Sequence, residues 1–334
     1  MGANLAIVGA TGAVGREFVR ILEERDFPHD DVTFLASHRS AGKTLTYRGQ
    51  THTIVELTDK SFAGVDLALF SAGGSISKRF APIAVEAGAV VVDNSSAFRM
   101  EPEVPLVVPE INAADIDGHQ GIIANPNCST IIMNVPVWPL HRANPIRRIV
   151  MSTYQAVSGI GAAAMAELAE STRAALEGQA YEQKQIPHPA AFNVWSHGSD
   201  IGEDGYNVEE RKTWRETRKI FHCDEIRVTA TCIRVPVMRA HCEAINLEFT
   251  EPMAEDKVRQ ILADAPGVKI VDDRERNHFP MPVEATGQDD ILVGRIRQDV
   301  SQPDGRGIDL FVSGDQLRKG AALNAVQIAE HLAK

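Results

Sequence analysis

Asn4-Leu-Ala-Ile-Val-Gly-Ala-Thr-Gly-Ala-Val-Gly15 opens the chain and indicates the architecture of its first half. The apolar run 4–8 is typical of a short buried strand, and the amphipathic stretch 16–25 predicts a helix. A strand, a glycine turn and a helix in this order are typical of dinucleotide-binding domains, here with the variant spacing Gly-x-x-Gly-x-x-Gly. Glycines let the backbone approach a pyrophosphate at the helix N-terminus. We predict a dinucleotide site here, and the simpler interpretation is a plain tight turn.

The same alternation of elements continues along the chain. Further buried strands are predicted at 32–36, 65–74 and 89–94, with a helix at 77–87. The pattern predicts an α/β fold with a doubly wound, Rossmann-type parallel sheet and helices on both faces. Ser71, Ala72 and Gly73 fall at a strand's carboxyl end, where a cofactor lies in such sheets.

The turn after the second strand, Ser37-His-Arg-Ser-Ala-Gly-Lys43, bears on the choice of dinucleotide. NAD-binding domains usually carry an acidic residue here to bind the ribose hydroxyls, and this turn has no carboxylate. Ser37, Arg39 and Ser40 suit a 2′-phosphate, so the sequence favours NADP over NAD. The alternative is a solvated basic turn.

A second informative stretch is Gly121-Ile-Ile-Ala-Asn-Pro-Asn-Cys128-Ser-Thr-Ile-Ile-Met, where an apolar strand passes into a predicted helix. Pro126 holds Asn125 away from helical geometry, and Asn127 is a preferred capping residue. A cysteine in a first helical turn lies beside unsatisfied backbone N–H groups, which favour its thiolate and can hold an oxyanion. Cys128 is therefore the candidate nucleophile. The alternative is a small buried hydrophobe, as most free cysteines are.

After Cys128 the predicted pattern becomes α+β. A strand at 147–155 ends at Gln155 before a glycine turn, and an alanine-rich helix follows at 162–176. Further strands are predicted at 228–235 and 240–249. In the last of them, apolar Ile245, Leu247 and Phe249 alternate with polar residues, which predicts a sheet with one covered face.

One more helix is marked by Asn207 and Glu210, which have the spacing of a capping box. Glu209, Lys212, Glu216 and Lys219 share one face of this helix. Taken alone, that face most simply indicates an exposed row of ion pairs.

Composition limits the classes of function. The chain has 334 residues, enough for two domains, and a formal net charge of -11 without a basic block, which argues against nucleic acid or an anionic membrane as partner. Four cysteines without framework spacing predict reduced thiols in a cytoplasm. The sequence contains neither Cys-x-x-Cys nor His-x-x-x-His, and no apolar run approaches the roughly 18 residues of a membrane helix. We expect a soluble, cytoplasmic protein without a metal, nucleic-acid or membrane partner.

Five motifs together resemble the aspartate-semialdehyde dehydrogenases. They are Gly9-Ala-Thr-Gly-Ala-Val-Gly15, Asn125-Pro-Asn-Cys-Ser-Thr130, Gln155-Ala-Val-Ser-Gly159, Arg234-Val-Pro-Val-Met-Arg-Ala-His241 and Lys319-Gly-Ala-Ala-Leu-Asn324. The glycine motif is shared with many folds, but the cysteine motif followed by Arg-x6-His is specific. The related N-acetyl-glutamyl-phosphate reductases usually show Asn-Pro-Gly-Cys, so Asn127 fits the aspartyl enzymes.

The resemblance implies an overall organisation and an activity. We expect an NADP-binding domain of residues 1–127, rejoined by a C-terminal helix at 315–334, and a catalytic and dimerisation domain of residues 128–314. The implied reaction is the reversible, NADP-dependent reductive dephosphorylation of 4-phospho-L-aspartate to L-aspartate 4-semialdehyde. It belongs to the biosynthesis of diaminopimelate, lysine, threonine, methionine and isoleucine. The implied assembly is a homodimer or a dimer of dimers.

The resemblance also implies residue roles. Cys128 would form the acyl-enzyme, His241 would act as acid and base, and Gln155 would position the substrate or the thiolate. Three residues would hold the amino-acid end of the substrate, namely Asn127, Glu209 and Arg234, while Arg99 and Lys212 would bind the phosphate. The NADP site would be lined by Gly9, Thr11, Gly12, Ala13, Val14, Ser37, Arg39, Ser40, Ser71, Ala72, Gly73, Ser158, Gly159 and Gln316 or Asn324.

The chemistry is coherent from the residues themselves. A thiolate displaces phosphate to give a thioester, nicotinamide hydride reduces it, and an imidazole gives its proton to sulfur as the aldehyde leaves. A guanidinium matches a planar carboxylate and an ammonium a phosphate, which agrees with the roles of Arg234 and Lys212. Arg234 and His241 can meet only if Pro236 turns the chain. The alternatives are an N-acetyl-glutamyl-phosphate reductase-like enzyme, a catalytically silent NADP-binding relative, and a thiol protease-like hydrolase.

Overall fold

The computed structural model describes residues 2–333 and divides the chain into two compact units. The first joins Met1–Asn127 to Ala321–Lys334, and the second is Cys128–Gly320. The chain returns to the first unit at Ala321, six residues later than the expected return at residue 315. Residues 315–320 belong to the second unit because Gln316 bonds to Ser158 and to the backbone N–H of Ala240 there.

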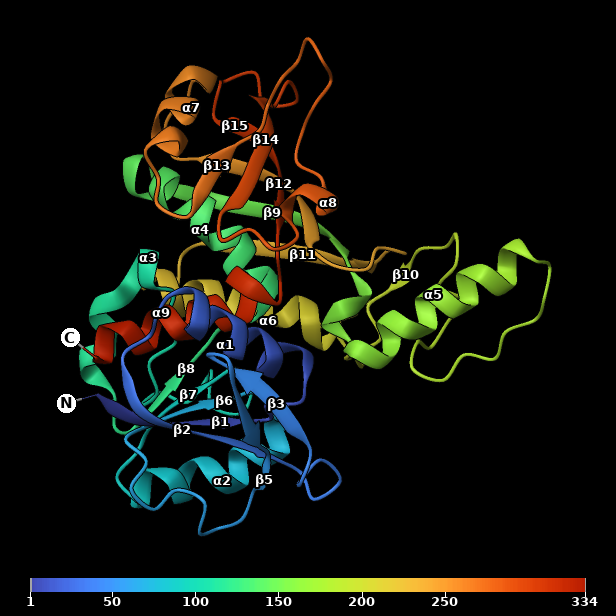
Figure 1. Cartoon of the computed structure of the whole chain (residues 1–334). Helices are drawn as coiled ribbons and strands as arrows, with labels where there is room; N and C mark the ends of the chain where they lie inside the picture. The colour runs from blue at the N-terminus through green and yellow to red at the C-terminus, as the bar shows by residue number, and fades with distance from the viewer. Residues whose placement is uncertain (1, 334) are drawn as a thin grey trace. The chain divides into compact units, whose positions relative to one another are not determined.

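The first unit contains a six-stranded parallel sheet (Figure 1) with the order β5-β2-β1-β6-β7-β8. Its strands are β1 (Ala3–Val8), β2 (His29–Ala36), β5 (Val55–Glu56), β6 (Leu67–Phe70), β7 (Val90–Asp93) and β8 (Ile122–Ala124). The strand order reverses between β1 and β6, as in dinucleotide-binding domains. The predicted doubly wound sheet is therefore confirmed.

Side-chain alternation along β1 explains the layers of this unit. Leu5 and Ile7 pack in a core with helices α1 (Ala13–Glu24) and α9 (Leu323–Leu332). Ala6 and Val8 point to the other face and pack with α2 (Gly74–Glu86). The C-terminal helix α9 thus completes the core of the first unit.

The remaining elements of the first unit are short. They are the hairpin β3 (Thr44–Tyr47) and β4 (Gln50–Thr53), the helix α3 (Pro109–Asn112) and the 3₁₀ helix η1 (Ala113–Gly118). The sequence analysis did not predict the hairpin, which follows the turn that contains Arg39.

The second unit is built on a seven-stranded mixed sheet with the order β10-β11-β9-β12-β15-β14-β13. Its strands are β9 (Ile146–Gln155), β10 (Trp195–Ser196), β11 (Arg227–Arg234), β12 (His241–Phe249), β13 (Val268–Ile270), β14 (Ile291–Gln298) and β15 (Gly307–Gly314). Mixed pairing with helices on one face agrees with the α+β prediction.

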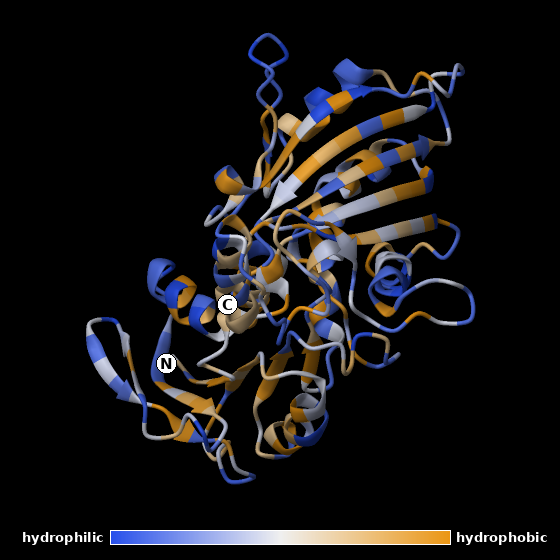
Figure 2. Ribbon diagram, turned by 90° about the vertical axis from the view of Figure 1, so that its right-hand side faces the viewer, coloured by the Kyte–Doolittle hydropathy of each residue, from blue (hydrophilic) through white to orange (hydrophobic). Residues whose placement is uncertain are grey.

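One face of this sheet is covered by helices α4 (Cys128–Ala143), α6 (Val208–Phe221) and α7 (Glu255–Ala263). Ile245, Leu247 and Phe249 are at most 2% exposed on that face. Residues between them on β12, such as Asn246, are half-buried on the opposite face. Figure 2 shows the alternation of hydrophobic and hydrophilic residues along these strands.

The other elements of the second unit are α5 (Ala162–Leu176), α8 (Pro282–Ala285), the 3₁₀ helix η2 (Val157–Gly159) and the π-helix η3 (Arg318–Ala322), whose last residues belong to the first unit. The predicted capping box of α6 is present: the Asn207 side chain accepts from the Glu210 N–H, and the Glu210 carboxylate accepts from the Asn207 N–H. Among the described residues, no helix is long and apolar enough to cross a lipid bilayer.

The prediction of an exposed row of ion pairs on α6 is wrong. Glu209 is 4% exposed and Glu216 is 1% exposed, because this face of the helix packs towards β11 and α4 instead of facing water. Buried carboxylates need partners or lose their charge. The carboxylates on this face of α6 therefore do not serve as a water-exposed surface.

Candidate active site

The glycine turn of the first unit has the geometry that a dinucleotide requires. Gly9 has φ +87°, and a Cβ there would lie 2.9 Å from the backbone of Ser71. A Cβ on Gly15 would lie 2.1 Å from the Gly9 carbonyl oxygen, so only glycine lets α1 pack this closely. At Gly12, by contrast, the nearest atom is 3.4 Å from a built Cβ, and this position faces open space. The N-terminus of α1 carries no acidic residue in its first turn, which suits an anion.

The other predicted cofactor residues of this unit lie at the same edge of the sheet. The Gly9 N–H donates to the Leu35 carbonyl at the end of β2 (2.8 Å), which places the turn with Arg39 beside the glycines. The Ser71 N–H donates to the Val8 carbonyl (2.8 Å), so the loop after β6 adjoins them from the other side. Arg39 is exposed and forms no hydrogen bond or ion pair within the described residues, so its guanidinium can receive a phosphate.

A pocket of about 340 Å³ lies beside this turn. Thr11 lines it together with Arg16 and Lys43, two cations that the sequence analysis did not assign. Lys43 is the last residue of the basic turn 37–43, so the sequence of that turn already contained a signal for this cation. These residues fit an anionic dinucleotide, and the fit does not depend on Arg39 alone.

Arg99, predicted to bind phosphate, is a buried guanidinium held by backbone carbonyls. It is 7% exposed and donates to the carbonyls of Asn125 (2.9 Å) and Asn94 (2.8 Å). The Asn125 side chain accepts from Asn324 (2.7 Å), which also donates to the Val107 carbonyl (2.9 Å). Asn324 is 0% exposed and supports the segment before Cys128.

Cys128 is the first residue of α4, as the sequence predicted, and is half-buried. A Cβ on Gly320 would lie 3.0 Å from the Cys128 Cβ, so the chain passes close to the thiol. The buried cysteines differ from it: burial raises the pKa of Cys232 above its usual range and the pKa of Cys242 to about 11. None of the four cysteines forms a disulfide bond within residues 2–333. Cys223 is also half-buried but lies after the end of α6, whereas Cys128 begins a helix, so Cys128 is the thiol whose position suits a nucleophile.

His241 is fully buried at the start of β12, and its two ring nitrogens have different environments. Nδ1 accepts a hydrogen bond from the Ala156 N–H (3.0 Å), and Nε2 has no partner among the described residues. Because Nδ1 accepts, the neutral ring carries its proton on Nε2. Burial, and secondarily Arg234, lower the pKa of His241 well below its ordinary value. The neutral ring therefore presents an Nε2–H donor that no group in residues 2–333 uses.

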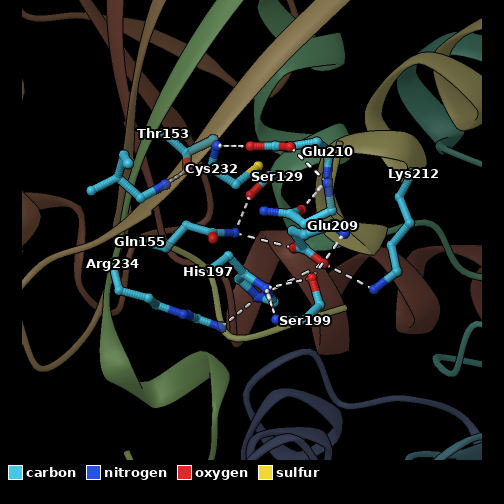
Figure 3. A network of polar contacts seen from close by, with 12 residues as sticks. Ser129, Thr153, Gln155, His197, Ser199, Glu209, Glu210, Lys212, Cys232 and Arg234 are labelled. Carbon is cyan, nitrogen blue, oxygen red and sulfur yellow. Dashed lines mark hydrogen bonds and ion pairs between the residues drawn. The ribbon is translucent and has the colours of Figure 1, made fainter. Parts of the chain in front are cut away.

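Gln155 connects the nucleophile's helix to α6. Its Nε2 donates to Ser129 Oγ (2.8 Å) and to Glu209 Oε1 (3.1 Å), and its Oε1 is buried without a partner. Glu209 also accepts from Lys212 Nζ (2.9 Å). Ser129 was not predicted, although it stands inside the cysteine motif. The predicted trio of Gln155, Glu209 and Lys212 is brought together in one network (Figure 3).

Arg234 ends β11, opposite Gln155 in the parallel pairing, and is 6% exposed. One Nη donates to the Ala156 carbonyl (2.8 Å), and the other contacts His197 Nε2 (2.9 Å). Burial lowers the pKa of His197 to about 4. His197 was missed because an isolated histidine in a connection has no spacing signal in sequence.

Pro236 lies in a tight turn in which the Val237 N–H donates to the Val235 carbonyl (2.8 Å). The turn brings Arg234 and His241 to the same place. A Cβ on Gly159 would lie 2.9 Å from Arg234 Nη1 and 3.5 Å from His241 Nε2. Gly159 therefore leaves open the space next to both side chains.

Ser158 and Gln316, predicted for the cofactor, bond to each other in the second unit. Gln316 Oε1 also accepts from the Ala240 N–H (2.8 Å), and both side chains are at most 2% exposed. Gln316 thus holds the segments before His241 and around Gly159 in place. No group of three His, Cys, Asp or Glu side chains that could bind a metal occurs in residues 2–333.

The second unit therefore gathers a thiol, an unused imidazole donor, a buried cation and a buried carboxylate. Such an arrangement can attack a carbonyl, hold the resulting oxyanion and bind a zwitterionic end of a substrate. The first unit has the glycine turn of a dinucleotide-binding domain. Dehydrogenases that proceed through a thioester combine these two sets of groups.

Family profiles identify the class. The profile described as "Semialdehyde dehydrogenase, NAD binding domain" matches residues 4–119, and that described as "Semialdehyde dehydrogenase, dimerisation domain" matches residues 137–319. The two profiles together span most of both compact units, and they define a semialdehyde dehydrogenase.

Individual relatives identify the family. The chain is 57% identical over 329 residues to the aspartate-semialdehyde dehydrogenase of Synechocystis sp., covering 98% of this chain and 97% of that protein. It is 50% identical to the enzyme of that name from Aquifex aeolicus, covering 100% of this chain and 99% of that one. The crystal structure of Vibrio cholerae aspartate semialdehyde dehydrogenase II complexed with ASA is similar, with a TM-score of 0.96, 44% identity and coverage of 99% and 98%. This chain belongs to the aspartate-semialdehyde dehydrogenase family and is an oxidoreductase.

Proposed function

We propose that this chain reduces 4-phospho-L-aspartate to L-aspartate 4-semialdehyde with NADPH, reversibly and through a thioester on Cys128. The product supplies the synthesis of diaminopimelate, lysine, threonine, methionine and isoleucine. The observation that carries the proposal is the cluster of His241, Gln155, Arg234 and Glu209 in the unit that Cys128 begins. The Vibrio cholerae relative complexed with ASA and the Candida albicans relative with NADP support the substrate and the cofactor.

The residues divide the chemistry between them. The Cys128 thiolate attacks the acyl carbon, the carbon–oxygen bond to phosphate breaks, and a thioester remains. NADPH, which the glycine turn 9–15 and Arg39 would hold, would supply a hydride to the thioester carbon. The resulting oxyanion returns its electron pair to the carbon, the carbon–sulfur bond breaks, and the thiolate leaves.

His241 is assigned to the oxygen of the reacting carbonyl. Its Nε2–H has no protein partner and can donate to the oxyanion, which forms once before phosphate leaves and again after reduction. We propose that His241 fills the acid and base role predicted from sequence through Nε2, because Nδ1 accepts from the Ala156 N–H. Gln155 Oε1, buried without a partner, is the group proposed to accept from the substrate.

The two ends of the substrate are assigned by charge. Arg234 is proposed to pair with the α-carboxylate and Glu209 with the α-ammonium. Lys212, which already contacts Glu209, and Arg99 are proposed to bind the phosphate. Asn127, directly before the nucleophile, is kept as a substrate contact. In the first unit, Arg39 with Ser37 and Ser40 is proposed to select NADP.

The test is an absorbance assay for NADPH formation from L-aspartate 4-semialdehyde, NADP and phosphate. We expect turnover that requires phosphate and is much faster with NADP than with NAD. Turnover with N-acetyl-glutamate semialdehyde instead would favour the acetylated-substrate alternative. NADP binding without turnover of either aldehyde would identify a catalytically silent relative.

We also propose that the chain forms a homodimer, or a dimer of dimers, through the second unit, where the dimerisation profile matches. Tyr154 lies on the sheet face opposite the covering helices and is 41% exposed. Its ring lies beside that of Phe311, with ring centroids 6.1 Å apart. Tyr154→Asp should shift the protein towards monomer in analytical ultracentrifugation. An unchanged sedimentation coefficient would show that another surface is used.

A further inference from the structure

His197 takes no part in the proposed chemistry, yet it lies between the two side chains assigned to the amino-acid end of the substrate. It follows β10, and its backbone N–H donates to the Cys232 carbonyl on β11 (2.9 Å). Its Nε2 is 2.9 Å from an Nη of Arg234 and 4.0 Å from Glu209 Oε2 (Figure 3). The backbone hydrogen bond of His197 thus holds its imidazole between the guanidinium of Arg234 and the carboxylate of Glu209.

The hydrogen bonds determine which nitrogen of His197 carries the proton. A guanidinium can only donate, so Nε2 accepts from Arg234 and the proton is on Nδ1. From there it donates to Ser199 Oγ (3.0 Å), which also accepts from the Glu209 backbone N–H (3.2 Å). The longer contact from the Ser199 N–H to Nδ1 (3.3 Å) is incompatible with this proton and is not a hydrogen bond in this state. His197 therefore links Arg234 to the first turn of α6.

A neutral acceptor has a particular consequence at this position. Arg234 and Glu209 are 6% and 4% exposed, and opposite charges attract strongly where water is excluded. A carboxylate in place of His197 would hold Arg234 but cancel its charge. The imidazole of His197 accepts from one Nη of Arg234 and leaves the positive charge of Arg234 in place. Burial keeps this imidazole neutral by lowering the pKa of His197 to about 4.

We propose that His197 is a positioning residue that determines substrate specificity: its neutral ring holds Arg234 apart from Glu209, so that one charge meets the α-carboxylate and the other the α-ammonium. The inference rests on the proposed roles of Arg234 and Glu209. Without the acceptor at Nε2, Arg234 turns onto Glu209 and both charges are lost to the substrate.

The test compares three variants that separate the two ring nitrogens. His197→Gln places an amide oxygen near the position of Nε2 and keeps an acceptor for Arg234. His197→Asn places its amide near Nδ1 and loses that acceptor, and His197→Phe keeps the ring without either nitrogen. For Asn and Phe we expect the KM for the semialdehyde to rise by about ten- to a hundredfold, the range of one hydrogen bond to a charged group. The KM values for phosphate and NADP, and kcat at saturation, should stay within about threefold.

A second readout measures specificity directly. The analogue 4-oxobutanoate keeps the carboxylate but lacks the α-amino group, so it can contact Arg234 but not Glu209. The preference in kcat/KM for the amino substrate should therefore fall by about tenfold in His197→Asn and be largely retained in His197→Gln. Thermal unfolding of each variant identifies any that fail to fold, and the Gln variant still decides the question in that case.

Arg234→Lys separates the failure of this inference from the failure of the roles on which it rests. If Arg234→Lys leaves the KM for the semialdehyde unchanged, the role of Arg234 is wrong. If Arg234→Lys raises that KM while His197→Asn and His197→Phe leave it within about twofold, the proposal for His197 is overturned. Equal losses in the Gln and Phe variants would overturn it too, because the acceptor at Nε2 would then be irrelevant.

Discussion

The proposed cofactor region of the first unit and the proposed substrate region of the second consist of different kinds of groups. The first is made of backbone: the glycine turn 9–15 meets the ends of β2 and β6 at one edge of a parallel sheet. The second is made of buried side chains from β9, β11, β12 and α6, held by one another and by the backbone of Ala156. A backbone site depends on local conformation, whereas a side-chain site depends on every partner being in place. Substitutions should therefore affect the two regions in different ways.

The largest effect is expected at the nucleophile. Cys128→Ala should abolish turnover, because no thioester can form, and should leave NADP affinity unchanged since the cofactor groups lie on other segments. The assay and a fluorescence titration with NADPH measure the two effects separately. Cys223→Ala, at another half-buried thiol, is the matched control and should remain active. Residual turnover above roughly one per cent in Cys128→Ala would refute the covalent route.

Removal of a single cofactor contact should have a smaller and selective effect. Arg39→Ala should weaken NADP by about 1.5–3 kcal/mol, as for a hydrogen bond to a charged group, and leave NAD binding nearly unchanged. Arg39 is exposed without partners among the described residues, so stability should not change. Calorimetric titrations with both dinucleotides decide the question. Equal losses for NADP and NAD would place Arg39 away from the 2′-phosphate.

The dependence of the first region on backbone conformation is tested at Gly15. Gly15→Ala introduces a Cβ 2.1 Å from the Gly9 carbonyl oxygen, so the turn must move. We expect a loss of about 1–3 kcal/mol in unfolding free energy, as for overpacking, together with weaker NADP binding. Gly118→Ala, where nothing lies within 4 Å of the new Cβ, is the control. Wild-type stability and affinity in Gly15→Ala would show that the turn tolerates a side chain.

The smallest effect concerns a buried carboxyl of the second unit. Glu243 is 0% exposed, neither carboxyl oxygen has a partner, and burial raises its pKa well above 4.5. The folded state then holds a proton that the unfolded chain releases, so stability is lost as pH rises above about 4.5. Glu243→Gln should remove this loss and become more stable than the wild type, by at most about 1.4 kcal/mol per pH unit.

Chemical denaturation at pH 5 and pH 8 measures this difference, and Glu248→Gln on the opposite face of β12 is the matched control. The stability difference between Glu243→Gln and the wild type should grow with pH. A constant difference would mean that Glu243 is ionised in the folded protein and has a partner.

Much of the molecule followed from local sequence. The run from Asn4 to Gly15 predicted the strand, turn and helix; Asn207 and Glu210 predicted a helix start; and the residues before Cys128 placed it at the start of α4. These features depend on glycine conformation, capping and periodicity, which involve neighbours in the chain. For that reason the doubly wound sheet and the α+β second half could be predicted from sequence.

The tertiary structure alone decided which side chains meet. It buried Glu209 and Glu216 where the sequence indicated an exposed row, and it placed His197 between Arg234 and Glu209. It also bonded Ser129 to Gln155 and left Glu243 without a partner. These contacts join segments that are distant in the chain. Which side chains meet depends on the register in which the strands pair. Burial and proximity arise only when the sheet assembles, so the pattern of one segment cannot specify them.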